Sequence, residues 1–219
     1  MRLVNAASGQ PLTFLPRRVV LAGYTGRDRE AVQRHIDELL EQGIPAPQHT
    51  PELYRVDSDG VQIDGSLSRG AGRSSGEVEF VLLVAGGTTY VGVGSDHTDR
   101  DLERTAVVDA KRAFPKILGR DIWPLQDLLS DWDSLVLRSW ITNQDGRRKY
   151  QEGPIAAIMA PQELIGLLFE DERADGLVLY SGTVAAIEPA PERGSCRFEG
   201  EIVTHEGRTL MSCNYTYEA

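Results

Sequence analysis

Residues 76–96 read GEVEFVLLVAGGTTYVGVGSD. Two runs rich in apolar and β-branched residues flank the pair Gly86 and Gly87. A two-glycine connection between such runs predicts a β-hairpin, because glycine adopts without a clash the positive φ that tight hairpin turns require. With the two glycines in the turn, Ala85 pairs with Thr88, and the register of the whole hairpin follows.

That register brings three acidic residues together. Counting outward from the turn, Glu79 lies opposite Gly94 and Glu77 lies opposite Asp96. Side chains two residues apart share one face of a strand, and directly opposed Cβ atoms lie about 4.5–5.5 Å apart. The three carboxylates would repel one another at that spacing, and a divalent cation such as Mg²⁺ or Mn²⁺ would offset the repulsion. The alternative is an exposed hairpin whose acidic face is simply solvated, and a one-residue slip in register would separate the three side chains.

The composition limits the class of protein. The chain has 219 residues, of which 41% are hydrophobic, and a net charge of −10, which is typical of a globular protein large enough to bury a core. The negative charge argues against a nucleic-acid partner, and no apolar run approaches the roughly 20 residues that span a bilayer. The N-terminus has no continuous apolar segment of the kind found in signal peptides. We therefore expect a cytoplasmic protein without a nucleic-acid or membrane partner.

Cys196 and Cys213 are the only cysteines. Two cysteines in a chain of this size fit a reducing compartment, where such residues most often pack in the core. A disulfide between them is the alternative. The sequence has no C-x-x-C motif and no histidine-rich cluster, so a structural zinc site is not expected.

The first predicted helix spans residues 25–43. Thr25 and Asp28 resemble a capping box at its start, and Gly43 ends it. Apolar residues recur along it at helical spacing, which predicts one buried stripe. The proline-rich residues 44–52 then form a connector with little regular structure.

The rest of the chain alternates short β-rich runs with few helical ones. Further helices are expected from about Asp101, with Thr98 as a cap, and from Pro161. Residues 65–76 predict a loop, and residues 53–64 predict a hairpin or short strands that pair with each other. Other strands and hairpins are expected at residues 19–22, 132–153, 175–189 and 197–218. This pattern predicts an α+β fold, with mostly antiparallel strands in a roll or barrel and a few peripheral helices.

His35 and Glu38 stand three residues apart on the first predicted helix, so their side chains are neighbours on its surface. One interpretation is a general-base pair in which the carboxylate orients the imidazole. The alternative is an exposed polar pair without a catalytic role, and helical spacing alone favours that alternative.

The order of motifs resembles the fumarylacetoacetate hydrolase superfamily from about Val19 to Pro189. Five segments carry the resemblance. They are GEVEFVLLVAG, similar to the family's Glu-x-Glu strand; GVGSDHTDRDLE, similar to its Asn-Asp-x-Thr-x-Arg-Asp strand; DAKRAF, similar to its Lys-Ser-Phe segment; RRKYQEGPIAAIMAPQELI, similar to its Asn-Gly-x-x-x-Gln segment with the short helix that follows; and LVLYSGTVAAI, similar to its Thr-Gly-Thr-Pro strand.

The resemblance implies a single catalytic domain over residues 1–219, with a β-rich roll and an N-terminal strand and lid helix at about residues 17–43. It implies that the lid carries a catalytic His-x-x-Glu pair, and this favours the catalytic interpretation of the pair described above. The implied roles are metal ligands for Glu77, Glu79 and Asp96; catalysis for His35, Glu38 and Lys111; and substrate binding for Arg100, Lys111 and Thr183.

Four positions depart from the family pattern. Ser181 replaces the first threonine of Thr-Gly-Thr-Pro, and Val184 replaces its proline. Glu103 stands where many members have glutamine, and Asp145 replaces an asparagine before a turn glycine. The loop over the substrate and the polarity of the substrate are therefore expected to differ.

The resemblance implies a Mg²⁺- or Mn²⁺-dependent enzyme that acts on a 2-oxo acid or a 1,3-dicarbonyl acid. C–C bond hydrolysis of a fumarylacetoacetate-like diketo acid is the leading expectation, with decarboxylation, hydration or isomerisation as alternatives on the same metal site. A non-catalytic protein that binds a small ligand with the same fold is an alternative from another class. The expected partners are a small carboxylic acid and, since family members commonly pair, a second copy of the chain.

Overall fold

The computed structural model describes residues 1–41, 43–68, 73–192 and 194–218. Within these residues the strands form one large sheet, one five-stranded sheet and one short pair. The α-helices there are α1 (Arg29–Glu41), α2 (Val107–Arg112) and α3 (Pro161–Gly166). Most strand pairs are antiparallel. The expected α+β fold with mainly antiparallel strands is confirmed.

The large sheet contains β1 (Arg2–Asn5), β2 (Gln10–Thr13), β3 (Arg18–Gly23), β4 (Glu52–Val56), β5 (Val61–Ile63), β8 (Val78–Ala85), β9 (Thr88–Ser95), β11 (Lys116–Leu118), β12 (Asp121–Pro124) and β15 (Leu177–Tyr180). Its main path is β2-β1-β12-β9-β8-β15-β3-β4, and β11 joins β9 and β5 to it. The hairpin that we identified from the sequence therefore lies in the middle of this sheet.

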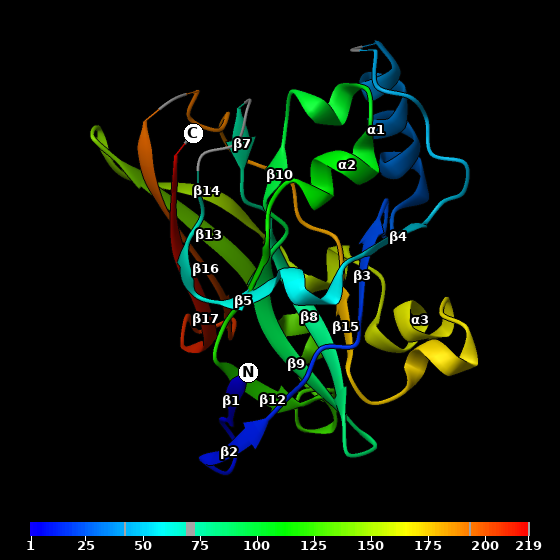
Figure 1. Ribbon diagram of the computed structural model, residues 1–219, viewed down its shortest axis with the longest axis vertical. Helices are drawn as coiled ribbons and strands as arrows, with labels where there is room; N and C mark the ends of the chain where they lie inside the picture. Colours follow the sequence, from blue (N-terminus) through cyan, green and yellow to red (C-terminus); the bar gives the residue numbers. More distant parts are fainter. Residues whose placement is uncertain (42, 69–72, 193, 219) are drawn as a thin grey trace.

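The five-stranded sheet contains β6 (Gly65–Ser66), β13 (Val136–Asn143), β14 (Gly146–Pro154), β16 (Ser195–Val203) and β17 (Thr209–Glu218), in the order β14-β13-β16-β17-β6. The short strands β7 (Ser74–Ser75) and β10 (Thr98–Asp99) pair with each other. In Figure 1 the N-terminal strands lie at the bottom, and α1 and α2 lie at the opposite end of the large sheet.

The β8–β9 hairpin has the predicted register. Ala85 pairs with Thr88 and Glu79 pairs with Gly94. Gly86 has a φ of 57° and Gly87 a φ of 72°, as a turn with two left-handed residues requires. Beyond the last paired residues, the Asp96 backbone N–H donates to the Glu77 carbonyl across 3.1 Å, so the ladder continues to the acidic residues.

Strand β8 is apolar at almost every position because it is buried on both faces. Phe80 and Leu82 point into the core that the five-stranded sheet also lines. Val81 and Leu83 belong to a second apolar cluster on the opposite face of the large sheet. Glu79 shares the face of Val81, so this carboxylate stands at the end of the second cluster, where the apolar packing stops.

Helix α1 lies within the predicted span, but its cap differs from the prediction. The Asp28 carboxylate accepts from the backbone N–H groups of Glu30 and Ala31, both at 3.0 Å, so Asp28 caps the helix. Thr25 does not, because its hydroxyl donates to the Ser181 carbonyl across 2.6 Å. The helix buries only Val32 and Ile36, which leaves most of its surface exposed.

The segment after Asp96 becomes helical later than expected. It first forms β10 and a 3₁₀ turn at Leu102–Arg104, and α2 follows that turn. The Asp99 carboxylate accepts from the backbone N–H groups of Asp101 and Leu102. Asp99 therefore caps this turn, and the predicted Thr98 cap was wrong.

Two further expectations were wrong in detail. The β4 and β5 strands do not form a hairpin with each other, since a 3₁₀ turn at Ser58–Gly60 separates them, β4 pairs with β3, and β5 pairs with β11. The chain at Trp132–Ser134 is a 3₁₀ turn, and the strand begins only at Val136. In both places distant strands and core packing decide the structure, and local propensity does not reveal them.

Cys196 and Cys213 are both buried and free, which confirms their expected role as packing residues. Part of the predicted 65–76 loop forms β6 and β7, and residues 69–72 lie outside the described residues. None of the helices in the described ranges is long and apolar enough to cross a membrane.

Candidate metal centre and active-site cavity

The acidic residues of the hairpin converge. Glu77, Glu79 and Asp96 each offer a carboxylate oxygen, and these oxygens all lie within 4.8 Å of one another. Glu79 is 2% exposed and Asp96 is 1% exposed, so the cluster is not the solvated acidic face of the alternative interpretation. The predicted proximity of the three side chains is confirmed, and their role as metal ligands stays a prediction.

Each carboxylate is held in place. The Gly182 backbone N–H donates to Glu79 Oε2 across 2.8 Å, and Arg100 Nη2 donates to Glu77 Oε1 across 2.8 Å. Gly182 has a φ of 84°, and a Cβ there would collide with the side chain of Thr25. Only glycine therefore lets the backbone approach Glu79 so closely.

Asp96 is bound by two lysines. Lys111 Nζ lies 2.5 Å from Asp96 Oδ2, and Lys116 Nζ lies 2.6 Å from Asp96 Oδ1. Lys116 also donates to the His97 carbonyl across 2.6 Å. Sequence analysis did not select Lys116, which stands only five residues after Lys111 and begins β11.

The pKa values of the clustered side chains shift in opposite directions. Burial, followed by the charges of Asp96 and Glu77, raises the pKa of Glu79 well above its ordinary value. Burial alone would also raise the pKa of Asp96, but Lys111 and Lys116 outweigh it and lower that pKa below its ordinary value. Burial opposes the charged form of Lys111 as well, and its pKa is nevertheless raised by Asp96 and Glu77. Asp96 and Lys111 are thus a charged pair beside an acid that is costly to ionise.

The donor set fits a hard divalent cation. Three carboxylates supply the oxygen ligands that Mg²⁺ and Mn²⁺ prefer, and three protein ligands leave coordination positions for water or substrate. Every carboxylate oxygen has two lone pairs, so an oxygen that accepts a hydrogen bond can still coordinate an ion. Glu77, Glu79 and Asp96 would hold the cation between them.

A cavity of about 650 Å³ opens beside the acidic cluster. Residues of α1, α2, β3, β4 and β8 line it, together with the loop that follows β15. Among the residues selected from the sequence, those in its wall are His35, Glu77, Glu79, Arg100, Lys111 and Thr183. The structure therefore brings the predicted base, two of the three acidic residues and the predicted substrate-binding residues to one cavity, and Asp96 lies behind its wall.

His35 and Glu38 are both on α1, and His35 Nδ1 lies 3.8 Å from Glu38 Oε2. Their side chains are 61% and 69% exposed. His35 is in the wall of the cavity, whereas Glu38 is not among the described residues that line it. Glu38 can therefore act on the cavity only through His35.

Arg100 is less available than its predicted role suggests. In addition to its bond with Glu77, Nη1 donates to Glu103 across 2.9 Å and Nε donates to the Ser75 hydroxyl across 2.7 Å. All three guanidinium nitrogens are thus engaged by the protein. In this structure Arg100 orients Glu77 and is neutralised by two glutamates.

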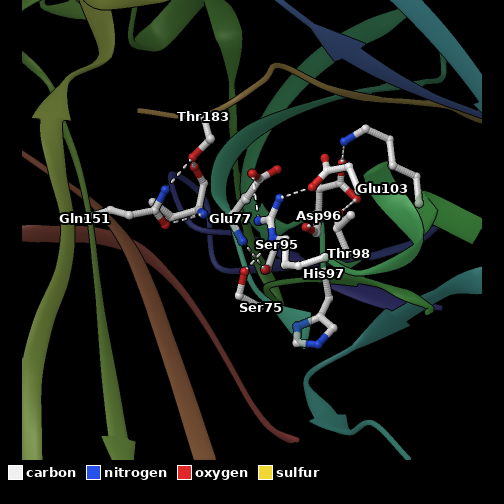
Figure 2. Close-up of polar contacts among 12 residues, drawn as sticks. Ser75, Glu77, Ser95, Asp96, His97, Thr98, Glu103, Gln151 and Thr183 are labelled. Atoms are coloured by element: carbon white, nitrogen blue, oxygen red, sulfur yellow. Dashed lines mark hydrogen bonds and ion pairs between the residues drawn. The ribbon is translucent and has the colours of Figure 1, made fainter. Parts of the chain in front are cut away.

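Thr183 is also engaged. Its hydroxyl donates to the Val78 carbonyl across 2.7 Å and accepts from Gln151 Nε2 across 2.8 Å. Gln151 Oε1 accepts from the Val78 backbone N–H across 2.9 Å. Figure 2 shows Gln151 and Thr183 on one side of Glu77, with Glu103 and Asp96 on the other. Gln151 therefore connects the loop after β15 to β8, the strand that carries Glu79. Gln151 lies in one of the motif segments, but the sequence pattern did not single it out as a site residue.

A second polar chain supports the cluster from behind. The Glu77 backbone N–H donates to the Ser95 hydroxyl across 3.1 Å, and this hydroxyl lies 2.9 Å from the Tyr215 hydroxyl. The Tyr215 hydroxyl in turn lies 2.9 Å from His97 Nδ1. Burial, followed by the charges of Lys116 and Arg100, lowers the pKa of His97 to about 3, so this histidine is neutral. His97 therefore supports the cluster through hydrogen bonds in this arrangement.

Three solved structures illustrate the fold. A putative fumarylacetoacetate isomerase/hydrolase from Oleispira antarctica has a TM-score of 0.69 and 16% identity, and the match covers 99% of each chain. A putative fumarylpyruvate hydrolase from Burkholderia cenocepacia has a TM-score of 0.63 and 16% identity, with 99% of this chain and 93% of that chain covered. A 2-keto-3-deoxyarabinonate dehydratase has a TM-score of 0.65 and 16% identity, with 92% and 73% covered.

These likenesses show that the chain has the fold of the fumarylacetoacetate hydrolase family, as the motif order predicted. No curated protein matches the chain in sequence. A family model described as "Protein of unknown function (DUF2848)" matches residues 22–215. The chain therefore belongs to the DUF2848 family and has a fumarylacetoacetate hydrolase-like fold.

Proposed function

We propose that this protein is a divalent-metal-dependent hydrolase that cleaves a C–C bond of a 2,4-dioxo acid. One observation carries the proposal: three carboxylates converge, and two of them, Glu77 and Glu79, line a cavity whose wall also contains His35 and Lys111. Mg²⁺ is the cation that we favour, with Mn²⁺ as the alternative. The bound cation would polarise the oxygens of the 2-oxo acid group and favour electron flow toward them.

We assign a separate role in the hydrolysis to each of His35, Glu38 and Lys111. His35 takes a proton from water as the water adds to the carbonyl carbon farther from the carboxylate, and Glu38 orients the imidazole. The bond between that carbon and the neighbouring methylene carbon breaks, and its electron pair stays with the 2-oxo acid fragment as an enolate. A proton returns to that fragment, so the products are one carboxylic acid and one 2-oxo acid. We assign to Lys111, which lines the cavity, the stabilisation of the developing negative charge.

Neighbours with this fold support the substrate class but leave the reaction open. Two of them are a putative fumarylpyruvate hydrolase and a 2-keto-3-deoxyarabinonate dehydratase, and both names contain a 2-oxo acid. His35 in the cavity wall favours hydrolysis, because a reaction that consumes water needs a group to activate it.

The test is an assay of the purified protein with a panel of 2,4-dioxo acids, in Mg²⁺, in Mn²⁺ and in excess EDTA. Hydrolysis predicts loss of the enol absorbance and the appearance of two acids by mass spectrometry, in metal only. Release of CO₂, or turnover that is unchanged in EDTA, would contradict the proposal. Glu77→Ala should abolish both metal binding and turnover.

A further inference from the structure

The cavity beside the acidic cluster has both acidic and apolar side chains in its wall. The carboxylates of Glu77 and Glu79 form part of it. The wall also contains apolar and aromatic side chains from α1, from the residues after it and from β4 and α2. These side chains are Val32, Leu39, Ile44, Tyr54 and Val107. A ligand whose head chelates a cation at the acidic cluster would extend its tail along this apolar wall.

The cations in the wall are already paired. Among the described residues that line the cavity, the lysine and arginine side chains are Arg27, Arg100 and Lys111. Arg27 is 2.9 Å from the carboxylate of Asp133, and Lys111 is 2.5 Å from that of Asp96. Lys111 lies at the acidic cluster, where the head of the ligand would bind. Arg100 is bonded to both Glu77 and Glu103, so its charge is not free for a second carboxylate of the ligand.

Glu103 removes that charge from the ligand. It lines the cavity, and its Oε2 accepts from Arg100 Nη1 across 2.9 Å while Glu77 accepts from Nη2. Arg100 thus bonds two carboxylates, and with Glu77 on the cation its charge is neutralised by Glu103. The charge of Glu103 also acts on Tyr24, whose pKa is raised by burial and then by this charge. Tyr24 also lines the cavity, from a backbone with a φ of 57°.

We propose that Glu103 is a specificity-determining residue, and that the substrate is a 2-oxo acid whose tail is uncharged and apolar and carries no second carboxylate. This inference rests on the proposed metal-dependent function and narrows it. Glu103 disfavours a distal carboxylate by direct repulsion and by occupying Arg100, while the apolar wall favours an alkyl or aryl tail.

The test compares two ligands of equal length, 2-oxopentanoate and 2-oxoglutarate, by titration calorimetry in saturating Mg²⁺. They share the 2-oxo acid head and differ in a terminal methyl or carboxylate. We expect 2-oxopentanoate to bind at least about tenfold more tightly, because like charges opposed in a binding site strongly disfavour a partner. Glu103→Gln should bind 2-oxoglutarate about tenfold more tightly than wild type and leave the affinity for 2-oxopentanoate unchanged.

Asp109→Asn is the matched control, since it removes the same charge from an exposed residue of α2 that is not among the described residues of the cavity wall. It should leave the ratio of the two affinities unchanged. Two results would overturn the inference: equal affinities of the wild type for the two ligands, or a ratio of these affinities that Glu103→Gln does not alter. In either case, Mg²⁺-dependent binding of oxalate would still support the metal centre. Failure to bind Mg²⁺ and oxalate would overturn the proposed function and this inference together.

Discussion

Lys111 and Asp96 form a buried ion pair, with Nζ 2.5 Å from Oδ2. The pair joins α2 to the end of the β8–β9 hairpin, which are 15 residues apart in the chain. Lys116 occupies the other Asp96 oxygen at 2.6 Å. Asp96 is therefore ionised and held in place before any cation binds. Glu79 differs, because in the described part of the chain its hydrogen-bond donor is the Gly182 backbone and not a cationic side chain. This asymmetry yields two separate predictions for stability.

Lys111→Met should destabilise the metal-free protein by roughly 3–5 kcal/mol, the usual cost of removing one partner of a buried ion pair. The substitution preserves most of the side-chain volume and removes only the charge. Mg²⁺ should restore part of the loss, because it supplies positive charge to the same cluster and binds only the native state. Melting curves in EDTA and in Mg²⁺ measure both effects.

Arg104→Met is the control for Lys111→Met, because it removes a positive charge from an exposed residue nearby. It should change the free energy of unfolding by less than about 0.5 kcal/mol. If Lys111→Met melted like this control in EDTA, the ion pair would contribute little to the fold.

Glu79→Gln should stabilise the metal-free protein and abolish its response to Mg²⁺. The raised pKa of Glu79 means that the native state holds its proton more tightly than the unfolded state does. The protonated Glu79 side chain therefore contributes fully to stability below the unfolded pKa of about 4.5. This contribution is lost as the pH rises through the raised pKa of the native state. Each unit of raised pKa corresponds to about 1.4 kcal/mol, so at pH 8 the isosteric amide removes a penalty that the wild type carries.

The measurement for Glu79→Gln is denaturant unfolding in EDTA at pH 5 and pH 8. Wild type should lose more stability than the variant between these pH values, and Mg²⁺ should raise the melting temperature of wild type alone. A variant that is still stabilised by Mg²⁺ would show that Glu79 is not a required ligand.

The parts of the site that sequence could predict are those fixed by local geometry. The Gly86–Gly87 turn sets the register of β8 against β9, and this register alone places Glu79 opposite Gly94 and brings the Asp96 backbone to Glu77. Two-residue periodicity then determines which side chains share a face. No distant contact is needed for either step, so the proximity of the three carboxylates followed from the sequence.

The partners of those carboxylates depend on contacts between distant segments. Gly182 reaches Glu79 across 103 residues, and Gln151 reaches Thr183 across 32. Thr25 resembled a helix cap, yet the fold places its hydroxyl against the Ser181 carbonyl, 156 residues away. Such pairings are set by how the sheets pack, which the local sequence pattern does not encode.

The protein should form a homodimer. The resemblance to the fumarylacetoacetate hydrolase superfamily motivates this prediction, and large apolar side chains remain on the surface of the single chain, with Phe169 71% exposed and Leu15 66% exposed. Light scattering at micromolar concentration should return twice the mass of 24.1 kDa. A monomer mass at that concentration would count against the pairing.

The last prediction concerns His35 as the base that activates water. It lines the cavity from α1, a helix that buries only Val32 and Ile36, so the side chain can change without disturbing the core. His35→Ala should lower kcat by roughly 10²–10⁴-fold, the usual range for the loss of a general acid or base. The affinity for Mg²⁺ should stay near that of wild type, because the imidazole is not among the three oxygen ligands of the acidic cluster.

Arg34→Ala provides the matched control for His35→Ala. Arg34 precedes His35 on the same exposed helix but is not among the described residues that line the cavity, so its loss should leave kcat near wild type. Glu38→Gln should lie between the two, because it weakens the orientation of the imidazole and keeps the base itself. Single-turnover rates and the Mg²⁺-dependent shift in melting temperature separate an effect on chemistry from an effect on metal binding. If His35→Ala turns over the substrate at the wild-type rate, water is activated elsewhere, and a decarboxylation or isomerisation that needs no attacking water becomes the better account of this cavity.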